Sequence, residues 1–232
     1  MVPLFKRLAL LFVVWLLALP TGYAQIKWVA RLNSGFHNYR FLDHQTLFGI
    51  GPNRAFTVNT ELEALAQKTI NKHLRISGGI SYLRNPYRYN NVPIQGFIDP
   101  LSSSINFDKV GDIISTDHSI GLPIYLHGYL GAKNRFIIGG GLIQNILLYH
   151  RNVIISKEAD VKLKQVNSTK SIYPYYTGAF ELGYNLTLAN HNELLITFRT
   201  STNLSLMFNK LAGHTLEYTM GLSVGYNFST FF

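Results

Sequence analysis

The residues best placed to do chemistry in this chain are ionisable side chains on the polar faces of alternating segments. Six share that position: Glu61, Glu63, Arg75, Glu181, Arg199 and Glu217. Successive side chains of a β-strand point to opposite faces, so acids and bases at alternate positions gather on one side of a sheet. Charges enclosed in a narrow interior must find partners, because an unpaired buried charge is costly. We predict that these six residues form a structural charge network. The alternative is a charge-lined pore or proton path.

Other reactive side chains give weaker signals. The chain has 8 His and no short-spaced pair of them, and a metal site needs ligands that converge. Asp117, His118 and Ser119 form the one local cluster typical of a hydrolase. Neighbours in a strand face opposite sides, so Asp117 and His118 would not converge there, and a catalytic triad is defined by geometry. We therefore predict no catalytic residue, no metal and no cofactor, and keep an enzyme acting on membrane lipid as an alternative.

Charge and composition limit the class of partner. The chain carries a net charge of +9, only 14% charged residues and no Cys, so it has neither a disulfide framework nor a thiolate metal site. Nucleic acid is not expected as a partner of an exported protein. The segment 152–170 contains several lysines, which could engage lipopolysaccharide phosphates or simply keep a loop solvated.

The elements that must position these residues show a period of two. The clearest runs from Leu216 to Phe228, with large apolar residues on one face and small or polar residues on the other. A run of three glycines interrupts the segment 135–151, which is apolar on both faces, and the segment that begins at Ile26 is the weakest. Alternation over about ten residues is typical of tilted membrane strands. We predict eight strands: 26–38, 55–70, 74–89, 117–131, 135–151, 171–188, 193–208 and 214–228.

The gaps between these segments alternate in length. Short gaps centre on 71–73, 132–134 and 190–192, and long gaps cover 39–54, 90–116 and 152–170. Outer-membrane barrels have short periplasmic turns and long extracellular loops. With the first strand starting in the periplasm, every short gap falls on the periplasmic side. We therefore predict an all-β, antiparallel transmembrane β-barrel of eight strands, or of ten if 39–54 or 90–116 contains a hairpin.

The start of the chain predicts export. Lys6 and Arg7 precede an apolar run that Pro20 ends, and small residues follow. This order is typical of a secretory signal peptide, and the run is shorter than the ~20 residues that a membrane-spanning helix needs. We predict a signal peptide over 1–24, cleaved between Ala24 and Gln25, and a single barrel domain over 25–232.

The end of the chain resembles the insertion signal of bacterial outer-membrane barrels, in which the last strand and a terminal aromatic residue are read by the insertion machinery. Tyr226, Phe228 and Phe232 carry this resemblance. It favours a membrane barrel over a soluble, lipocalin-like carrier, which alternation alone would also allow.

The middle of the chain resembles the PorT-like outer-membrane barrel family. Ile120, Leu122, Pro123 and Ile124 match its aliphatic-Pro-aliphatic strand, and Phe136 with the glycines 139–141 matches the Gly-rich strand that follows a short turn. The resemblance implies a barrel, and some family members are similar to an accessory factor of secretion and gliding. Its motifs are structural, so it transfers no functional residue.

These observations predict a monomeric protein of the cell outer membrane of a Gram-negative bacterium. The expected partners are outer-membrane lipid and lipopolysaccharide, the barrel-insertion machinery and an unknown envelope protein. The leading function is a structural or interaction role at the cell surface, as an accessory to a secretion or envelope assembly. A small pore or transporter is the second hypothesis, and an enzyme acting on lipid is the third.

Overall fold

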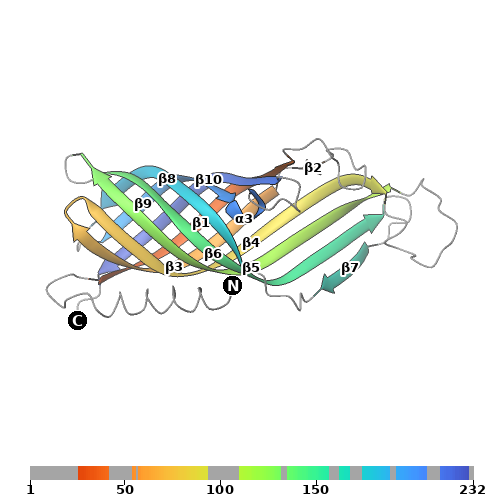
Figure 1. The fold of residues 1–232 in the computed structure, drawn as a ribbon, viewed down its shortest axis with the longest axis horizontal. Helices are drawn as coiled ribbons and strands as arrows, with labels where there is room; N and C mark the ends of the chain where they lie inside the picture. The colour runs from red at the N-terminus through yellow and green to blue at the C-terminus, as the bar shows by residue number, and fades with distance from the viewer. Residues whose placement is uncertain are drawn as a thin grey trace.

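Strands form nearly all of the structure (Figure 1). The computed structural model describes residues 26–41, 54–55, 57–93, 110–131, 135–156, 162–167, 174–188, 192–207 and 215–229. The long strands are β1 (Ile26–Phe41), β3 (Thr57–Asn71), β4 (Leu74–Pro93), β5 (Val110–Leu130), β6 (Phe136–Ser156), β8 (Pro174–Thr187), β9 (Glu193–Asn203) and β10 (Thr215–Ser229). Two short strands, β2 (Arg54–Ala55) and β7 (Lys162–Asn167), and one helical turn, α3 (Leu204–Met207), complete the described elements.

The eight long strands close on themselves. The hydrogen-bonded order is β4-β3-β1-β10-β9-β8-β6-β5, and a further β4–β5 pairing joins the two ends. Each of these pairings is antiparallel. The predicted eight-stranded antiparallel barrel is therefore confirmed. The short strands lie outside this ring, where β2 pairs with β4 and β7 pairs with β6.

One predicted strand is too long. The sequence alternation predicts a strand over 193–208, but β9 ends at Asn203 and α3 follows. The Leu204 side chain lies over Gly178 of β8, and the Tyr176 amide donates to Ser205 Oγ at 2.8 Å. These tertiary contacts fold the end of the segment back onto β8, which local alternation could not reveal. Within the described residues, no helix is long and apolar enough to cross a membrane.

The outer surface of the barrel is apolar and the interior is polar. Leu222 is 61% exposed whereas the next residue, Ser223, is 1% exposed. The same alternation runs along β3, where Leu62 faces out and Glu61 and Glu63 face in. A water-soluble monomer does not expose a continuous apolar surface of this kind. The structure is therefore a transmembrane barrel, and not a soluble carrier with an apolar interior.

The apolar band has the height of a membrane. On β5 the exposed apolar residues run from Leu130 to Ile120. Ten residues cover ~34 Å along a strand at about 3.4 Å per residue. At the ~45° tilt usual in such barrels, this corresponds to a band ~25 Å tall. Residues of β5 before Ser119 therefore lie beyond the membrane.

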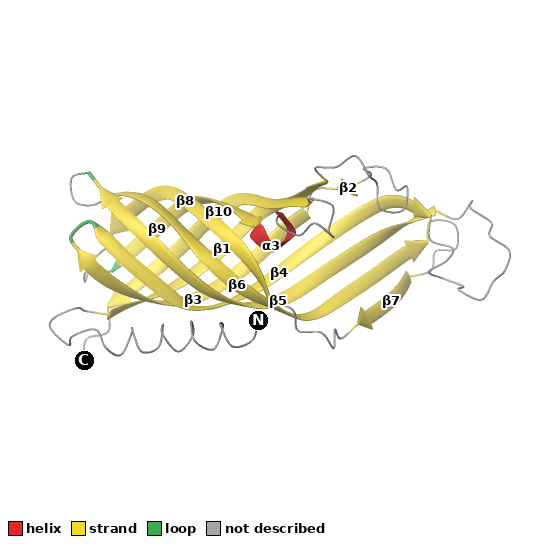
Figure 2. Cartoon of the chain, in the orientation of Figure 1, coloured by secondary structure: helices red, strands yellow, loops and turns green. Residues whose placement is uncertain are grey.

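The two ends of the barrel differ. Short connections join β3 to β4, β5 to β6 and β8 to β9 at one end. At the other end β4, β5 and β6, which are 20, 21 and 21 residues long, continue past their neighbours. With β7, they form a flat extension next to the barrel mouth, near α3 (Figure 2). We call residues 86–93, 110–116 and 151–156, with β7, the projecting sheet.

The lipid-facing assignment of β10 predicts an asymmetric response to substitution. An arginine at a lipid-facing position near the bilayer midplane costs ~2–4 kcal/mol. Leu222→Arg should therefore impair assembly far more than Leu222→Ala, as measured by the share of protein whose gel mobility changes on boiling. Cysteines introduced at positions 222 and 223 provide the control. Labelling of 223, and not of 222, by a lipid-soluble reagent would contradict the observed register.

Candidate functional site: charge network and polar cup inside the barrel

Two arginines and three glutamates occupy the centre of the barrel. Arg31 of β1 lies 2.8 Å from Glu181 of β8, between Nη1 and Oε1. Arg199 of β9 reaches Glu63 of β3 with Nη1 at 2.9 Å and Glu61 with Nη2 at 3.1 Å. All five residues are at most 6% exposed. The central network therefore links strands that are not neighbours in the sheet, across the interior.

Two aromatic rings of β5 complete the central network. The Tyr125 hydroxyl donates to Glu63 Oε1, and the His127 Nε2 lies 2.9 Å from Glu181 Oε2. The centre of the Tyr125 ring lies 5.1 Å and 5.4 Å from the guanidinium carbons of the two arginines. A cation near an aromatic face is stabilised by the ring quadrupole, and more strongly when both are shielded from water. Tyr125 thus helps to hold two like charges in one interior.

Two of the three consecutive glycines of β6 make room for these rings. Tyr125 pairs in register with Gly141, and His127 pairs with Gly139. A Cβ atom at Gly141 would lie 2.3 Å from Tyr125 Cδ1, and one at Gly139 would lie 2.3 Å from His127 Cδ2. Gly139 and Gly141 are therefore the surface on which the two rings lie, and this explains why the inward positions of this part of β6 carry no side chains.

A second cluster lies towards the short-turn end. Glu193 of β9 forms an ion pair with Arg75 of β4, and Lys27 Nζ lies 3.4 Å from its Oε1. The Arg75 guanidinium lies 4.0 Å from the centre of the Tyr129 ring. Asn227 of β10 donates to Glu193 Oε2 at 3.0 Å. This layer links β1, β4, β9 and β10 towards the short-turn end.

A third cluster lies towards the mouth and surrounds Glu217 of β10. Its Oε1 is 2.9 Å from His37 Nε2, and it accepts hydrogen bonds from Asn85 at 2.9 Å and Tyr87 at 3.0 Å. Its other oxygen accepts from Asn203 at 2.9 Å. Four side chains from β1, β4 and β9 therefore converge on one buried carboxylate.

The partners of Arg199 agree only in part with those predicted. The alternation on adjacent strands predicts that Arg199 pairs with Glu181 or Glu217. The pair with Glu181 is present, at 3.9 Å between Arg199 Nε and Glu181 Oε1, but the pairs with Glu61 and Glu63 are shorter, and Glu217 belongs to the cluster at the mouth. Sequence reasoning also omitted Arg31 and Glu193. Both follow the same alternation as the six predicted residues, so the pattern itself could have identified them.

The predicted processing and insertion residues are only partly described. Ala24, Gln25 and Phe232 lie outside the described residues. Tyr226 and Phe228 are on the outer face of β10 near the short-turn end, with ring centres 6.3 Å apart. Rings at this depth are typical of the aromatic girdle of membrane barrels.

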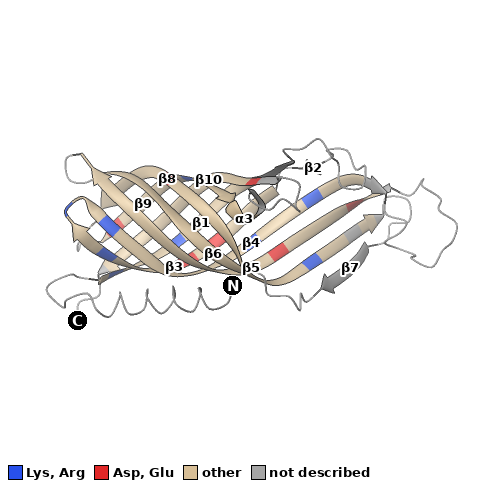
Figure 3. Ribbon diagram, in the orientation of Figure 1, with Lys and Arg blue, Asp and Glu red and all other residues tan. Residues whose placement is uncertain are grey.

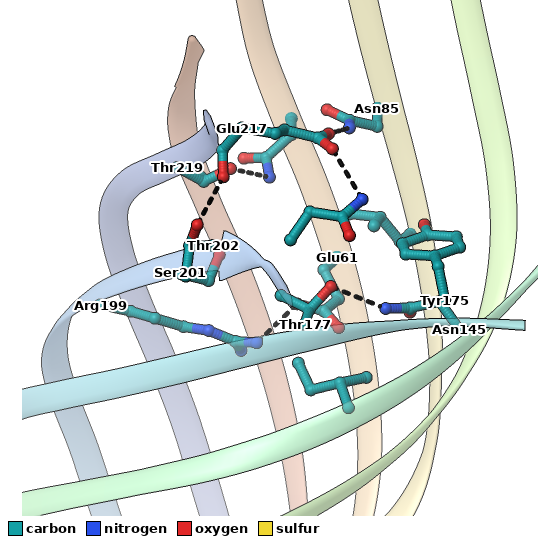
Figure 4. Close-up of a pocket in the computed structure, with 14 residues that line it drawn as sticks. Glu61, Asn85, Asn145, Tyr175, Thr177, Arg199, Ser201, Thr202, Glu217 and Thr219 are labelled. Atoms are coloured by element: carbon teal, nitrogen blue, oxygen red, sulfur yellow. Dashed lines mark hydrogen bonds and ion pairs between the residues drawn. The ribbon is translucent and has the colours of Figure 1, made fainter. Parts of the chain in front are cut away.

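A polar cup lies between the central network and the mouth. The space inside it that water can occupy is about 30 Å³. Arg199 and Glu61 lie at one end and Glu217 at the other, with Asn145 and Tyr175 among the side chains between them (Figure 4). The remaining lining consists mostly of amides and hydroxyls.

The cup presents unpaired acceptors. Within the described part of the chain, Glu61 Oε1, Asn85 Oδ1 and Asn145 Oδ1 have no hydrogen-bond partner. The Asn85 amide nitrogen donates to the Glu217 carboxylate, which only accepts, so the orientation of this amide is fixed and its oxygen faces elsewhere. The space beside these acceptors is large enough for about two water molecules, which can donate hydrogen bonds to them.

The local hydrolase-like cluster does not converge. Asp117 bonds to His150, Ser119 lies 3.1 Å from the Tyr175 hydroxyl, and His118 contacts two tyrosines on the outer surface. Among the described residues, no group of three His, Asp or Glu side chains is placed to hold a metal ion.

Comparison with known proteins gives structural matches alone. No family model and no curated protein sequence matches the chain. The solved structures that it resembles include the attachment invasion locus protein Ail of Yersinia pestis, with 10% identity over 88% of this chain and 99% of that one and a TM-score of 0.42. Neisserial surface protein A has 10% identity, 88% and 97% coverage and a TM-score of 0.40. The outer membrane protein OprG of Pseudomonas aeruginosa has 11% identity, 90% and 99% coverage and a TM-score of 0.36.

The barrel's own features define its class. It has an even number of antiparallel strands, a closed ring, an apolar outer band and short turns at one end. This combination is that of an outer-membrane β-barrel. The protein is a small outer-membrane β-barrel with a polar, charged interior.

The contact between β5 and β6 predicts that Gly141 is intolerant of a side chain. Gly141→Ala places a methyl group against the Tyr125 ring, and overpacking of a filled interior typically costs about 1–3 kcal/mol. The midpoint of unfolding in detergent should fall. Gly128→Ala is the matched control, because its Cβ would have ordinary contacts of 3.4 Å and more. Equal midpoints for the two variants would contradict the packing described.

The pairing of Arg199 predicts a rescue. Removing one partner of a buried ion pair leaves an uncompensated charge and costs ~3–5 kcal/mol, less where water reaches it. Arg199→Ala should lower the unfolding midpoint, and adding Glu61→Gln should recover part of the loss. Adding Glu217→Gln should recover none, because Glu217 bonds to other residues. Recovery by Glu217→Gln alone would show that the charges pair differently.

Proposed function

We propose that this protein is a surface interaction protein, in which a filled barrel anchors the projecting sheet outside the membrane for contact with an envelope partner. The observation that carries the proposal is the continuation of β4, β5 and β6 past the barrel mouth as paired strands. The proposal assigns no catalytic role to the barrel.

The interior supports an anchoring role. Three layers of bonded side chains, centred on Glu193, on the central network and on Glu217, cross the barrel between its two ends. An eight-stranded barrel has an interior just wide enough for its own side chains. These layers leave the outer end of the molecule as its most accessible part.

Side-chain bonds join the strands of the projecting sheet. Arg88 Nη2 lies 3.2 Å from Asp112 Oδ2, and the backbone N–H of Asn91 donates to the same carboxylate at 3.1 Å. Ser115 donates to Asn152 at 2.6 Å across the next pair of strands. Paired strands with side-chain bonds present a defined surface, which suits recognition of a partner.

We propose that the partner of the projecting sheet is a protein of the cell envelope. The resemblance to PorT-like barrels favours a secretion or envelope assembly, and it stays a prediction because no family model matches the chain. The short-turn end and the lipid-facing surface are the alternative contact sites that an experiment must separate from the projecting sheet.

Photo-crosslinking in intact cells tests the proposal. A photoreactive residue at Ile113, in the projecting sheet, should capture an envelope protein. The same residue at Leu122, on the lipid face, and at Lys72, in a periplasmic turn, provides matched controls. Protein adducts at Lys72 and none at Ile113 would place the interaction in the periplasm and reject the proposal.

A small pore or transporter is the second candidate, and the polar cup favours it. Conduction would require the central network to open, since Arg199 and Glu61 form the floor of the cup. In planar bilayers the wild-type protein should show little steady conductance. Large, stable openings whose ion selectivity changes in Arg199→Ala would favour the pore and contradict the anchoring role.

A further inference from the structure

An aromatic and basic cluster lies on the outer surface where the apolar band ends. His118 of β5 lies between Tyr82 of β4 and Tyr149 of β6. The Tyr82 hydroxyl and His118 Nδ1 share a hydrogen bond of 2.5 Å, and the His118 and Tyr149 rings stack with centres 4.2 Å apart. Stacked rings held by a hydrogen bond form a fixed platform on this face of the barrel.

Two arginines flank this platform. Arg84 pairs in register with His118, and Arg151 pairs with Thr116. They therefore lie on either side of β5 and are offset by two residues along it, about 12 Å apart at the backbone, since strands are about 4.8 Å apart and each residue advances about 3.4 Å. Arginine side chains are long enough to converge on one group at that separation. Figure 3 shows basic residues on β4 and β6 in this region, with acidic residues on β5 between them.

The two arginines have no counter-charge of their own. Both are exposed, and within the described residues neither has a hydrogen bond or ion pair to another side chain. Arg88, farther out on the same strand, differs because it bonds to Asn90 and Asp112. Asp117, which precedes His118 on β5, is bound to His150.

The position of the cluster identifies the phase that it meets. Ile80 on β4 and Ile120 on β5 are the last exposed aliphatic residues before Arg84 and His118. The guanidinium groups therefore lie at headgroup depth, at the end of the barrel that faces away from the periplasm. Aromatic rings favour this interface, and arginine binds phosphate with two parallel hydrogen bonds.

We propose that Arg84 and Arg151, with the Tyr82–His118–Tyr149 platform, form a binding site for a phosphate group of lipopolysaccharide in the outer leaflet. The phosphate accepts hydrogen bonds from both guanidinium groups, while the rings pack against the sugar and acyl boundary. Arg151 is the first residue of the projecting sheet on β6, so the site adjoins that sheet at the rim of the barrel. The lipid is nevertheless a different ligand from the envelope partner proposed for the sheet.

Lipid binding to the purified barrel in neutral detergent tests the site. The probes are diphosphoryl lipid A, dephosphorylated lipid A and phosphatidylglycerol, and bound lipid is counted by native mass spectrometry during titration. Arg84→Gln with Arg151→Gln should weaken binding of diphosphoryl lipid A about tenfold or more. Arg135→Gln with Lys72→Gln removes the same charge at the periplasmic end and should change it less than twofold.

Three results would overturn the proposal. The first is equal loss of binding in the two double variants, which would indicate an effect of net charge alone. The second is equal binding of diphosphoryl and dephosphorylated lipid A. The third is tighter binding of phosphatidylglycerol than of lipid A, which would assign the site to a phospholipid. Because gel mobility before boiling reports folding of every variant, loss of the barrel cannot be mistaken for loss of the site. Crosslinking at Ile113 is a separate measurement, so failure of either proposal is distinguishable.

Discussion

The ion pairs across the centre of the barrel are the interaction on which the rest of the interior depends. Arg31 joins β1 to β8, and Arg199 joins β9 to β3, so opposite sides of the ring are tied directly rather than through intervening strands. The interior is too narrow for water to solvate the buried charges, so each guanidinium group must form ion pairs with carboxylates. These ion pairs can form only if the strands have this order and these residues face inward.

The other side chains of the interior pack around these ion pairs. Carboxylates and guanidiniums come from β1, β3, β8 and β9, while β5 contributes rings and β6 contributes glycines against which the rings lie. The layers around Glu193 and Glu217 repeat the same solution, with one carboxylate surrounded by several donors. The polar cup is what is left between two such layers.

Much of this fold can be predicted from the alternation of apolar and polar residues. The features that cannot be predicted in this way have physical causes. A period of two assigns Leu222 and Ser223 to opposite faces, and the spacing of turns assigns the ends, because both are local properties. The shortest ion pairs of Arg199 are not local, because closure brings β3 across the interior from β9, and adjacent strands predict only the longer contact with Glu181. The role of Gly141 cannot be predicted from its own segment for the same reason, because this glycine makes room for the Tyr125 ring of another strand. The added length of β4, β5 and β6 falls in segments without clear alternation.

The unequal strand lengths have a consequence for motion in the membrane. A barrel whose strands all end at the rim has the same shape in every direction around its axis. Rotation about that axis therefore does not change which surface it presents to its neighbours. Here β4, β5 and β6 rise from one part of the circumference, so the molecule has a front and a back. Any object held by that extension sits off the axis and sweeps a circle as the barrel turns. Attachment to a stationary assembly would therefore arrest rotation as well as lateral drift, and fix which flank of the barrel faces its neighbours.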